Sequence, residues 1–540
     1  MTQISAQTRH GGFHVAETLQ LYGIDEIFTL SGAHIFPIYD ACRDMGIKMY
    51  DVRHEQTAAF AAEATAKLLR RPGVAALTAG PGVTNAVSAV ASAQANGSPV
   101  VVLGGRAPTT RWGLGSLQEF DHVPLLAPVT KAATTAFAVE KLSATLGDLI
   151  DRALSPHRGP VFLDIPADVL NTEAPLNLAD PSPSLAPLPD EKDLQTAREL
   201  LVTAQRPAIL AGSDVWWNGA WDSLRVAAEH LAIPTFTNGM GRGCLSADSP
   251  LFFSRSRHLL KTADVVAIVG TPLDFRVSYG RLGAAQVIHV VDAIDQRRVA
   301  EPAAVTLSGD LGRCLDYLAD GPAIVPSSRK EWLDGLRAEE ASKRQAYQVE
   351  MDTDRTPIHP ARIYGELLTR LDKDAIIIGD GGDFVSYAGR FLPSYEPGVW
   401  LDTGPFGCLG SGFGYAMAAR LAYPDRQIVL LLGDGAFGFA GMEIDTLVRH
   451  GLGVTMIMGN NGIWGLEKHP MQARYGYDVL ADLQPGCRYD VLATSLGAAG
   501  ELVERSSDVG PAIERALSSD APYLVNVLTD PTVAYPRSAF

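Results

Sequence analysis

Short apolar runs recur along the chain, and each is followed by a longer stretch with helical character. Strands that alternate with helices form parallel sheets, because the return helix lets the next strand run in the same direction. Helices then cover both faces of each sheet. The pattern therefore predicts an α/β fold with three doubly wound parallel-sheet domains. The runs that we predict to be strands are residues 26–30, 48–52, 74–78, 100–103, 161–164, 208–210, 265–269, 287–291, 427–432 and 454–458.

Two polar segments divide these runs into three blocks. Residues 171–191 are rich in Pro, Ser, Asn and Asp, which is typical of a linker, and residues 326–357 contain a charged helix. The first and third blocks are similar in length and rhythm, which hints at a duplication. We predict an N-terminal domain at residues 1–172, a middle domain at 190–325 and a C-terminal domain at 357–540.

Size and charge limit the classes of function. The 540 residues are enough for about three domains, and a hydrophobic content of 46% with 20% charged residues is ordinary for a globular enzyme. The net charge of −16 argues against nucleic acid or an anionic membrane as the main partner. It does not exclude an anionic small substrate, because a site can be locally positive.

Cysteine use and the N-terminus indicate a compartment. The five cysteines are widely spaced and form no CxxC pair, which favours a reduced protein with neither a disulfide framework nor a zinc site. Residues 1–10 are polar, and no apolar run approaches the roughly 20 residues of a membrane span. We expect a cytoplasmic protein with no nucleic-acid or membrane partner.

Two apolar runs end in residues that suit a divalent metal and a diphosphate. Gly433-Asp434-Gly435 follows the run 427–432, and Asn460-Asn461 follows the run 454–458. Glycines let backbone N–H groups approach phosphate oxygens, and a following helix N-terminus favours negative charge. Mg²⁺ prefers hard oxygen ligands, which Asp434 and the Asn461 side chain supply. The alternative is a pair of ordinary strand-to-helix turns.

Gly-Asp-Gly followed, after a helix and a strand, by Asn-Asn resembles the signature of thiamine diphosphate (ThDP) enzymes. The whole chain resembles a ThDP-dependent enzyme of the acetolactate synthase, benzaldehyde lyase and 2-hydroxyacyl-CoA lyase group. The resemblance implies a pyrimidine-binding domain, a middle domain and a diphosphate-binding domain, with ThDP and Mg²⁺ as cofactors. It also implies active sites between two subunits, and hence a homodimer or homotetramer.

The resemblance assigns a catalytic role to Glu55, in Arg53-His54-Glu55-Gln56 at a predicted strand end. A hydrogen bond from this carboxyl group to the aminopyrimidine ring drives the imino tautomer, which removes the thiazolium proton. The alternative for Glu55 is a surface charge.

The resemblance also assigns the residues that hold the cofactor. In residues 404–410, Leu409 matches the bulky residue between the two rings, and the Gly407 carbonyl matches the acceptor for the amino group. The backbone at Gly433, Gly435 and Ala436 matches the diphosphate site. The metal ligands are Asp434, Asn461 and the carbonyl of Ile463.

Three polar residues are candidates for the substrate side of the site. His34 matches a histidine that lines the benzaldehyde lyase site, and a histidine can relay a proton near neutral pH. Gln118 matches a glutamine beside the cofactor in several members. Glu467 matches a pyruvate decarboxylase glutamate, and we expect Trp464 and Leu466 to bury it and raise its pKa. The alternatives are a solvated His34 and an ion pair of Glu467 with Lys468 or His469.

Different segments of the sequence resemble different branches of the group. Residues 433–443 and the segment 253–257 resemble the acyl-CoA branch, and Arg255 and Arg257 would pair with phosphates. The short C-terminal end, with Arg537 as its one basic residue, departs from that branch. Asp274-Phe275-Arg276 resembles the flavin-contacting segment of acetolactate synthases. The G-x-G-x-x-G fingerprint is absent there, so FAD or ADP in the middle domain stays open.

We expect a carboligase that decarboxylates a 2-keto acid of the pyruvate class and joins the resulting enamine to a second carbonyl. The alternative is a 2-hydroxyacyl-CoA lyase that releases formyl-CoA and an aldehyde or ketone. A basic groove toward Arg255 and Arg257 would favour the alternative. A more distant option is a non-catalytic regulatory relative, but such proteins typically lose the first-domain glutamate or the metal ligands.

Overall fold

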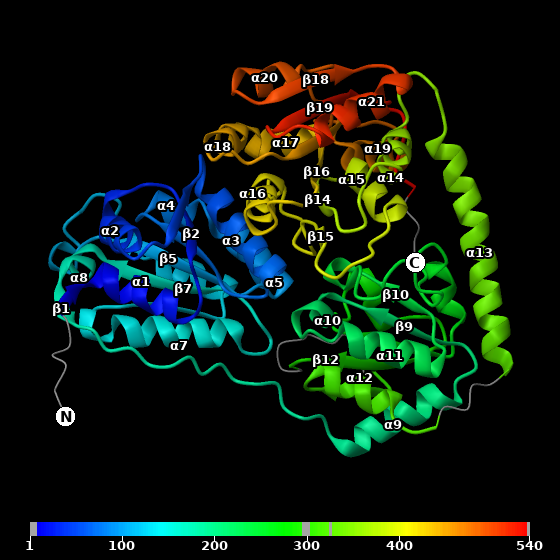
Figure 1. Ribbon diagram of the computed structural model, residues 1–540, viewed down its shortest axis with the longest axis horizontal. Coiled ribbons are helices and arrows are strands. Elements are labelled where there is room, and N and C mark those ends of the chain that lie inside the picture. The colour runs from blue at the N-terminus through cyan, green and yellow to red at the C-terminus, as the bar shows by residue number, and fades with distance from the viewer. Residues whose placement is uncertain (1–7, 294–302, 323–326, 537–540) are drawn as a thin grey trace.

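The computed structural model describes residues 8–293, 303–322 and 327–536. It contains three parallel sheets, one in each predicted block, which confirms the predicted fold class (Figure 1). The boundaries that we gave for the domains stay predictions, since the sheets fix only where the strands lie. Among the described helices, none combines the length and the apolar character that crossing a membrane requires.

The N-terminal sheet has the strand order β3-β2-β4-β5-β7-β6. Its central strands β4, β5 and β7 are fully buried, because helices cover both faces. Its strands are β2 (Glu26–Thr29), β3 (Lys48–Asp51), β4 (Gly73–Leu77), β5 (Val100–Arg106), β6 (Ala132–Thr135) and β7 (Val161–Pro166). Its helices are α1 (Gly11–Leu21), α2 (Phe36–Asp44), α3 (Glu55–Leu69), α4 (Pro81–Thr84), α5 (Val87–Asn96), α6 (His122–Leu126), α7 (Leu142–Leu154) and α8 (Ala167–Asn171). A short antiparallel pair, β1 (Thr8–His10) with β8 (Glu173–Pro175), closes the domain.

The C-terminal sheet has the order β15-β14-β16-β17-β19-β18. Numbered within each sheet, this is the same order as in the N-terminal sheet, which supports the duplication. Its strands are β14 (Ile376–Asp380), β15 (Trp400–Leu401), β16 (Ile428–Gly433), β17 (Thr455–Asn460), β18 (Ala499–Val503) and β19 (Tyr523–Leu528). Its helices are α14 (Pro360–Leu368), α15 (Asp383–Phe391), α16 (Gly412–Ala422), α17 (Asp434–Ala440), α18 (Ile444–Arg449), α19 (Gly465–Tyr475), α20 (Tyr489–Ser495) and α21 (Ser506–Leu517).

The middle domain has a smaller sheet of order β10-β9-β11-β12-β13. Helix α13 (Ser327–Met351) leaves this domain and runs along the outside of the molecule toward the C-terminal domain (Figure 1). The strands are β9 (Pro207–Ala211), β10 (Thr235–Thr237), β11 (Val265–Val269), β12 (Gln286–Val291) and β13 (Val305–Ser308), and the helices are α9 (Glu191–Thr203), α10 (Ser213–Trp217), α11 (Trp221–Leu231) and α12 (Leu311–Ala319).

The N- and C-terminal domains pack directly against each other through α3 and α16. Three buried polar groups join these helices. Lys67 Nζ lies 3.0 Å from Glu63 Oε1 and donates to the Tyr415 hydroxyl at 2.8 Å, and that hydroxyl donates to Glu63 Oε2 at 2.7 Å. Each polar group has a partner, which offsets the cost of its burial. The C-terminal half of α3, the helix that begins at Glu55, is thus held against the C-terminal domain.

Candidate cofactor site

The structure brings Asp434 and Asn461 to the same edge of the C-terminal sheet. Strands β16 and β17 are neighbours, with Gly433 paired to Gly459, so the residues that follow them leave the sheet side by side. Asp434 Oδ2 accepts a hydrogen bond from the Gly462 N–H at 2.8 Å. Ligands of open α/β sheets bind at this carboxyl edge, next to the point where the strand order reverses.

The surroundings of Asp434 suit a cation. Burial raises the pKa of Asp434 to about 6, although N–H groups of Gly462 and Gly435 favour its charged form. A second, half-buried carboxyl group, Asp383, accepts from Asn461 Nδ2 at 3.1 Å, and partial burial raises its pKa too. The two acids lie close enough for the charge of Asp383 to raise the pKa of Asp434, and a divalent cation would offset both negative charges. The donor set consists of oxygens, which fits Mg²⁺.

A hollow of 270 Å³ lies directly over Asp434 and Gly435. Any side chain at Gly435 would fill it, because a Cβ atom there would lie 2.4 Å from the Trp464 ring. The N–H groups in the first turn of a helix have no intrahelical partner; the Gly435 N–H faces the Asp434 carboxylate, and the Ala436 N–H follows it at the same helix end. The hollow over Asp434 and Gly435 therefore leaves room for a diphosphate at the predicted position.

The segment that contains Gly407 and Leu409 is fixed by a residue that we did not predict. The buried carboxylate of Asp380, at the end of β14, accepts from the N–H groups of Gly410 at 3.1 Å and Gly412 at 2.8 Å. Burial raises the pKa of Asp380 to about 6. Gly407 has a φ of 69°, in the left-handed region that favours glycine. The signal for Asp380 was present in the sequence, since Gly379-Asp380-Gly381 is a second Gly-Asp-Gly after an apolar run.

Glu55 begins α3 and is 8% exposed. Asn85 Nδ2 donates to Glu55 Oε2 at 3.0 Å, so Oε1 is the oxygen that faces the glycine turn at Gly82. The neighbouring residue Gln56 donates from Nε2 to the Leu409 carbonyl at 3.4 Å. The segment that contains Glu55 thus contacts the segment that contains Leu409 within the same chain. Asn85 is a further residue that we missed, and its signal is the preceding Gly-Pro-Gly turn.

Glu443 makes a second contact between the two domains. Its buried carboxylate accepts from the backbone N–H groups of Arg53 and His54, at 3.1 and 3.0 Å, and from the Thr446 hydroxyl at 2.5 Å. The sequence singles out Glu443 only as part of the segment 433–443. The sequence carries no sign of its partners, which lie in another domain.

His34 and Gln118 lie beside the segment of Thr78 and Gly80, next to the glycine turn that faces Glu55. His34 Nδ1 lies 3.2 Å from the Thr78 hydroxyl, and burial lowers its pKa, so the ring is neutral at pH 7. Gln118 has a φ of 58°, and its backbone packs against Gly80. The structure places both residues near Gly80 and Thr78; their contact with a substrate stays a prediction.

The surroundings of Glu467 differ from our expectation. Glu467 is exposed on α19, whereas Trp464 packs on Gly435 and Leu466 lies beside Gly382, so these two side chains do not bury it. The alternative ion pair with Lys468 is not formed either, because Lys468 pairs with Asp482 and Asp478. The expectation failed because the first turn of α19 turns Trp464 and Leu466 toward the sheet edge and Glu467 away from it.

The flavin-like segment also pairs internally. Arg276 Nη2 lies 2.7 Å from Asp274 Oδ2, so the two polar side chains of this segment neutralise each other. FAD or ADP in the middle domain stays a prediction.

Three domain models match the chain in order. They describe the N-terminal TPP-binding domain of thiamine pyrophosphate enzymes at residues 9–125, the central domain at 194–318 and the C-terminal TPP-binding domain at 380–527.

Similar proteins fall into two groups. A probable acetolactate synthase of Mycobacterium bovis and the acetolactate synthase large subunit IlvG of Mycobacterium tuberculosis are each 51% identical over 538 residues, which covers 98% of this chain and 98% of theirs. The 2-hydroxyacyl-CoA lyase 2 of Caenorhabditis elegans is 35% identical over 97% of this chain and 90% of its own. The human 2-hydroxyacyl-CoA lyase 2 is 34% identical over 93% and 86%.

Proposed function

Because this chain belongs to the thiamine pyrophosphate enzyme family, we propose that it decarboxylates a 2-keto acid of the pyruvate class and joins the remaining acyl unit to a second carbonyl. The observation that carries the proposal is the 51% identity to acetolactate synthases over nearly the whole chain. The buried Glu55 and the cradle around Asp434 supply the groups that this chemistry needs. The non-catalytic alternative receives no support, because Glu55, Asp434 and Asn461 are all retained.

Each group in the site has a defined task. When bound, ThDP supplies a carbon nucleophile and an electron sink for decarboxylation. Oxygens of Asp434, Asn461 and the Ile463 backbone would hold Mg²⁺ against its diphosphate. Glu55 would hold a hydrogen bond to the aminopyrimidine ring through Oε1, because Oε2 already accepts from Asn85.

The bond changes balance without an oxidant or reductant. The bond between the keto carbon and the carboxylate breaks, and CO₂ leaves. A new carbon–carbon bond forms to the carbonyl carbon of the second substrate, and the oxygen of that carbonyl takes a proton. His34, neutral at pH 7, and Gln118 would line the substrate side, and Glu467 would need cover from a second subunit to hold a proton there.

A homodimer or homotetramer would provide that cover. Several large apolar side chains near the site segments are exposed in the single chain, and exposed apolar patches mark interaction surfaces. A second copy over this face would also exclude water from the reaction. These side chains are Leu114, Leu117, Phe406, Phe439 and Met442, which are 77%, 80%, 51%, 61% and 51% exposed.

The second candidate is cleavage of a 2-hydroxyacyl-CoA to formyl-CoA and an aldehyde or ketone. The 2-hydroxyacyl-CoA lyase 2 relatives, which match over almost the full chain, favour it. Both reactions use the same cofactor residues, so the substrate alone distinguishes them.

One experiment separates the candidates. The protein with ThDP and Mg²⁺ receives pyruvate in one tube and a 2-hydroxyacyl-CoA in another, and mass spectrometry identifies the products. Acetolactate from pyruvate supports the proposal, whereas formyl-CoA as the main product reverses it. Sedimentation of the same preparation tests the oligomer, and a monomer that is fully active would contradict the shared active site.

A further inference from the structure

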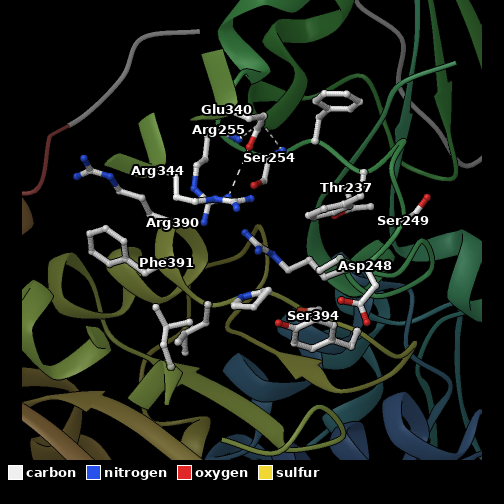
Figure 2. Close-up of a pocket in the computed structure, with 18 of the residues that line it drawn as sticks. Thr237, Asp248, Ser249, Ser254, Arg255, Glu340, Arg344, Arg390, Phe391 and Ser394 are labelled. Atoms are coloured by element: carbon white, nitrogen blue, oxygen red, sulfur yellow. Dashed lines mark hydrogen bonds and ion pairs between the residues drawn. The ribbon is translucent and has the colours of Figure 1, made fainter. Parts of the chain in front are cut away.

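A polar hollow of 660 Å³ lies between the middle and C-terminal domains, beside α13. Figure 2 shows Arg255, Arg344 and Arg390 gathered around Glu340 at one end of it. Glu340 Oε1 accepts from the three consecutive backbone N–H groups of residues 254–256, so this carboxylate ties α13 to the middle domain. The described lining of the hollow includes none of the residues predicted for the cofactor or the substrate. The pairing of Arg255 with a phosphate stays a prediction.

A second group of buried charges touches the predicted site directly. It lies at the carboxyl edge of the N-terminal sheet, where β5 ends at Arg106 beside the Asp164 strand β7. Arg106 Nη1 lies 2.5 Å from Asp164 Oδ2 and 3.2 Å from Asp121 Oδ1. The other oxygen of Asp164, Oδ1, lies 2.9 Å from His122 Nδ1. His122 and Asp164 are fully buried, so their polar atoms depend on partners inside the protein.

The hydrogen bonds of His122 determine its tautomer. The backbone N–H of Gly80 donates to His122 Nε2 at 2.9 Å. A backbone N–H can only donate, so Nε2 carries no proton and the proton of the ring lies on Nδ1, where Asp164 accepts it. A chain of contacts therefore runs from Arg106 through Asp164 and His122 to the backbone of Gly80.

The backbone that His122 holds has an unusual conformation. Gly80 has a φ of 60° and a ψ of −114°, the mirror image of the extended region, which favours glycine. A Cβ atom at Gly80 would lie 3.0 Å from the Gln118 Cβ, so the two segments pack directly on each other. Gln118 itself has a φ of 58°. Such conformations persist only where the surroundings hold them, and His122, which begins α6 shortly after Gln118, connects the two segments.

The segment that follows Gly80 leads to Glu55. The Gly80 carbonyl accepts from the Thr84 N–H at 3.0 Å, in the short helix α4, and Asn85 follows this helix. Asn85 donates to Glu55 Oε2 at 3.0 Å. A Cβ atom at Gly82 would lie 3.8 Å from Glu55 Oε1, so the same segment faces both oxygens of the carboxyl group. A shift of Gly80 would therefore move the groups that surround Glu55.

We propose that His122, held in one tautomer by Asp164, is a positioning residue that aligns Glu55 and Gln118 through the backbone of Gly80. His122 is fully buried and acts through this turn, not on the cofactor itself. The inference rests on the proposed function for the role of Glu55, whose hydrogen bond to the cofactor needs the same alignment in either candidate reaction. Small displacements of a catalytic group slow a reaction strongly, because the reacting geometry is narrow.

Two substitutions of His122 separate its two hydrogen bonds. In His122→Asn the amide nitrogen takes the place of Nδ1 and still donates to Asp164, but the acceptor for Gly80 is lost. In His122→Gln the amide oxygen takes the place of Nε2 and keeps the acceptor for Gly80, but the donor to Asp164 is lost. We expect His122→Asn to lower kcat about tenfold with little change in KM, and His122→Gln to recover most of that rate.

Near-ultraviolet circular dichroism of ThDP, bound in the presence of Mg²⁺, gives a readout that needs no substrate. His122→Asn should change the bands of the bound cofactor, and His122→Gln should restore them. Calorimetry should show ThDP uptake within about threefold of the original protein for both variants, since the Asp434 side of the site is untouched. If neither pyruvate nor a 2-hydroxyacyl-CoA is a substrate, the proposed function fails, and the cofactor bands still decide the role of His122.

His14→Asn is the matched control for loss of a buried imidazole. His14 lies on α1, where its Nε2 contacts the Ala174 carbonyl at 3.2 Å, and α1 carries none of the predicted site residues. This substitution should lower the melting temperature and leave kcat and the cofactor bands unchanged. A change of kcat in His14→Asn as large as that in His122→Asn would overturn the proposal, because general destabilisation would then explain both.

The relative behaviour of the two His122 variants also decides the matter. Equal slowing in His122→Asn and His122→Gln overturns the proposal, because the Gly80 bond would then not be the one that counts. Full rate and unchanged bands in both overturn it too, because the turn would hold its place without His122. If neither variant folds, hydrogen exchange of the original protein tests the contact: the Gly80 amide should exchange slowly, and exchange within seconds would show that it makes no lasting bond to His122.

Discussion

The Glu443 carboxylate lies 3.0 Å from the backbone nitrogen of His54, the residue directly before Glu55. Glu443 follows the Asp434 segment by one short helix, so this contact joins the diphosphate side of the site to the pyrimidine side. In an enzyme with active sites between two subunits, the two segments of one chain would serve different sites. Glu443 is then in a position to align Glu55 without touching the cofactor.

Glu443→Gln should lower kcat about tenfold and change KM little, because an NH2 donor replaces one accepting oxygen and would face the Arg53 N–H and the Thr446 hydroxyl, and the remaining oxygen loses its negative charge. The near-ultraviolet circular dichroism of bound ThDP should change as well, since the hydrogen bond from Glu55 shifts. Thr446→Val, which removes one donor to Glu443, should have a smaller effect. A loss of thermal stability with normal kcat in the folded fraction would contradict the aligning role.

Glu55→Gln should reduce acetolactate formation about 100-fold or more, because the amide cannot hold the proton that cofactor activation requires. Calorimetry should show ThDP binding near the original affinity, since Asp434 and the glycine backbone hold the diphosphate. Equal rates of CO₂ release in the two proteins would remove Glu55 from its assigned role.

Asp434→Asn should weaken Mg²⁺-dependent ThDP uptake at least about 100-fold, because it removes the one charged metal ligand. Asp482→Asn is the matched control: this carboxylate pairs with Lys468 on the surface and should be dispensable for cofactor binding. Chelation of Mg²⁺ from the original protein should reproduce the Asp434→Asn result. Unchanged ThDP uptake by Asp434→Asn would move the metal site elsewhere.

The raised pKa of Asp380 should make the free energy of unfolding of the cofactor-free protein depend on pH. Its pKa rises from 3.8 to about 6 on folding, so the folded state binds a proton that the unfolded state releases. The contribution of Asp380 is fully present below about pH 4 and is lost as pH rises through 6, by on the order of 3 kcal/mol.

Asp380→Asn removes this titration. The melting temperature of the original protein, relative to Asp380→Asn, should therefore fall between pH 4 and pH 7. Scanning fluorimetry of both proteins across that range measures it. A difference in melting temperature that stays constant with pH would show that Asp380 does not titrate there.

The sequence predicted well wherever a pattern is local. The run 265–269 is the strand β11 as predicted, and the helix-rich segments between runs cover the sheets, because strand periodicity and burial are set within a few residues. The neighbouring positions of Asp434 and Asn461 also followed, since adjacent parallel strands end at one edge. The exposure of Glu467 could not be predicted from the sequence, because it depends on how α19 is oriented against the sheet.

Hydrogen bonds across domains were outside what the sequence could indicate. Glu443 and His54 are separated by 389 residues, and no period or spacing links them. The same holds for Gln56 with the Leu409 carbonyl, and for Glu340 with the backbone of Ser254 to Ser256. Each contact depends on how whole domains pack.

The amino-acid sequence by itself determined the class of fold and the neighbouring positions of Asp434 and Asn461, because these depend on residue type and short spacing, and the catalytic role of Glu55 stays a prediction. Tertiary structure alone decided that Asp380 fixes the Leu409 segment, that Glu443 holds the residues before Glu55 and that cations converge between two domains. The physical reason is that burial and charge density depend on what packing brings together, and packing joins residues that are hundreds of positions apart.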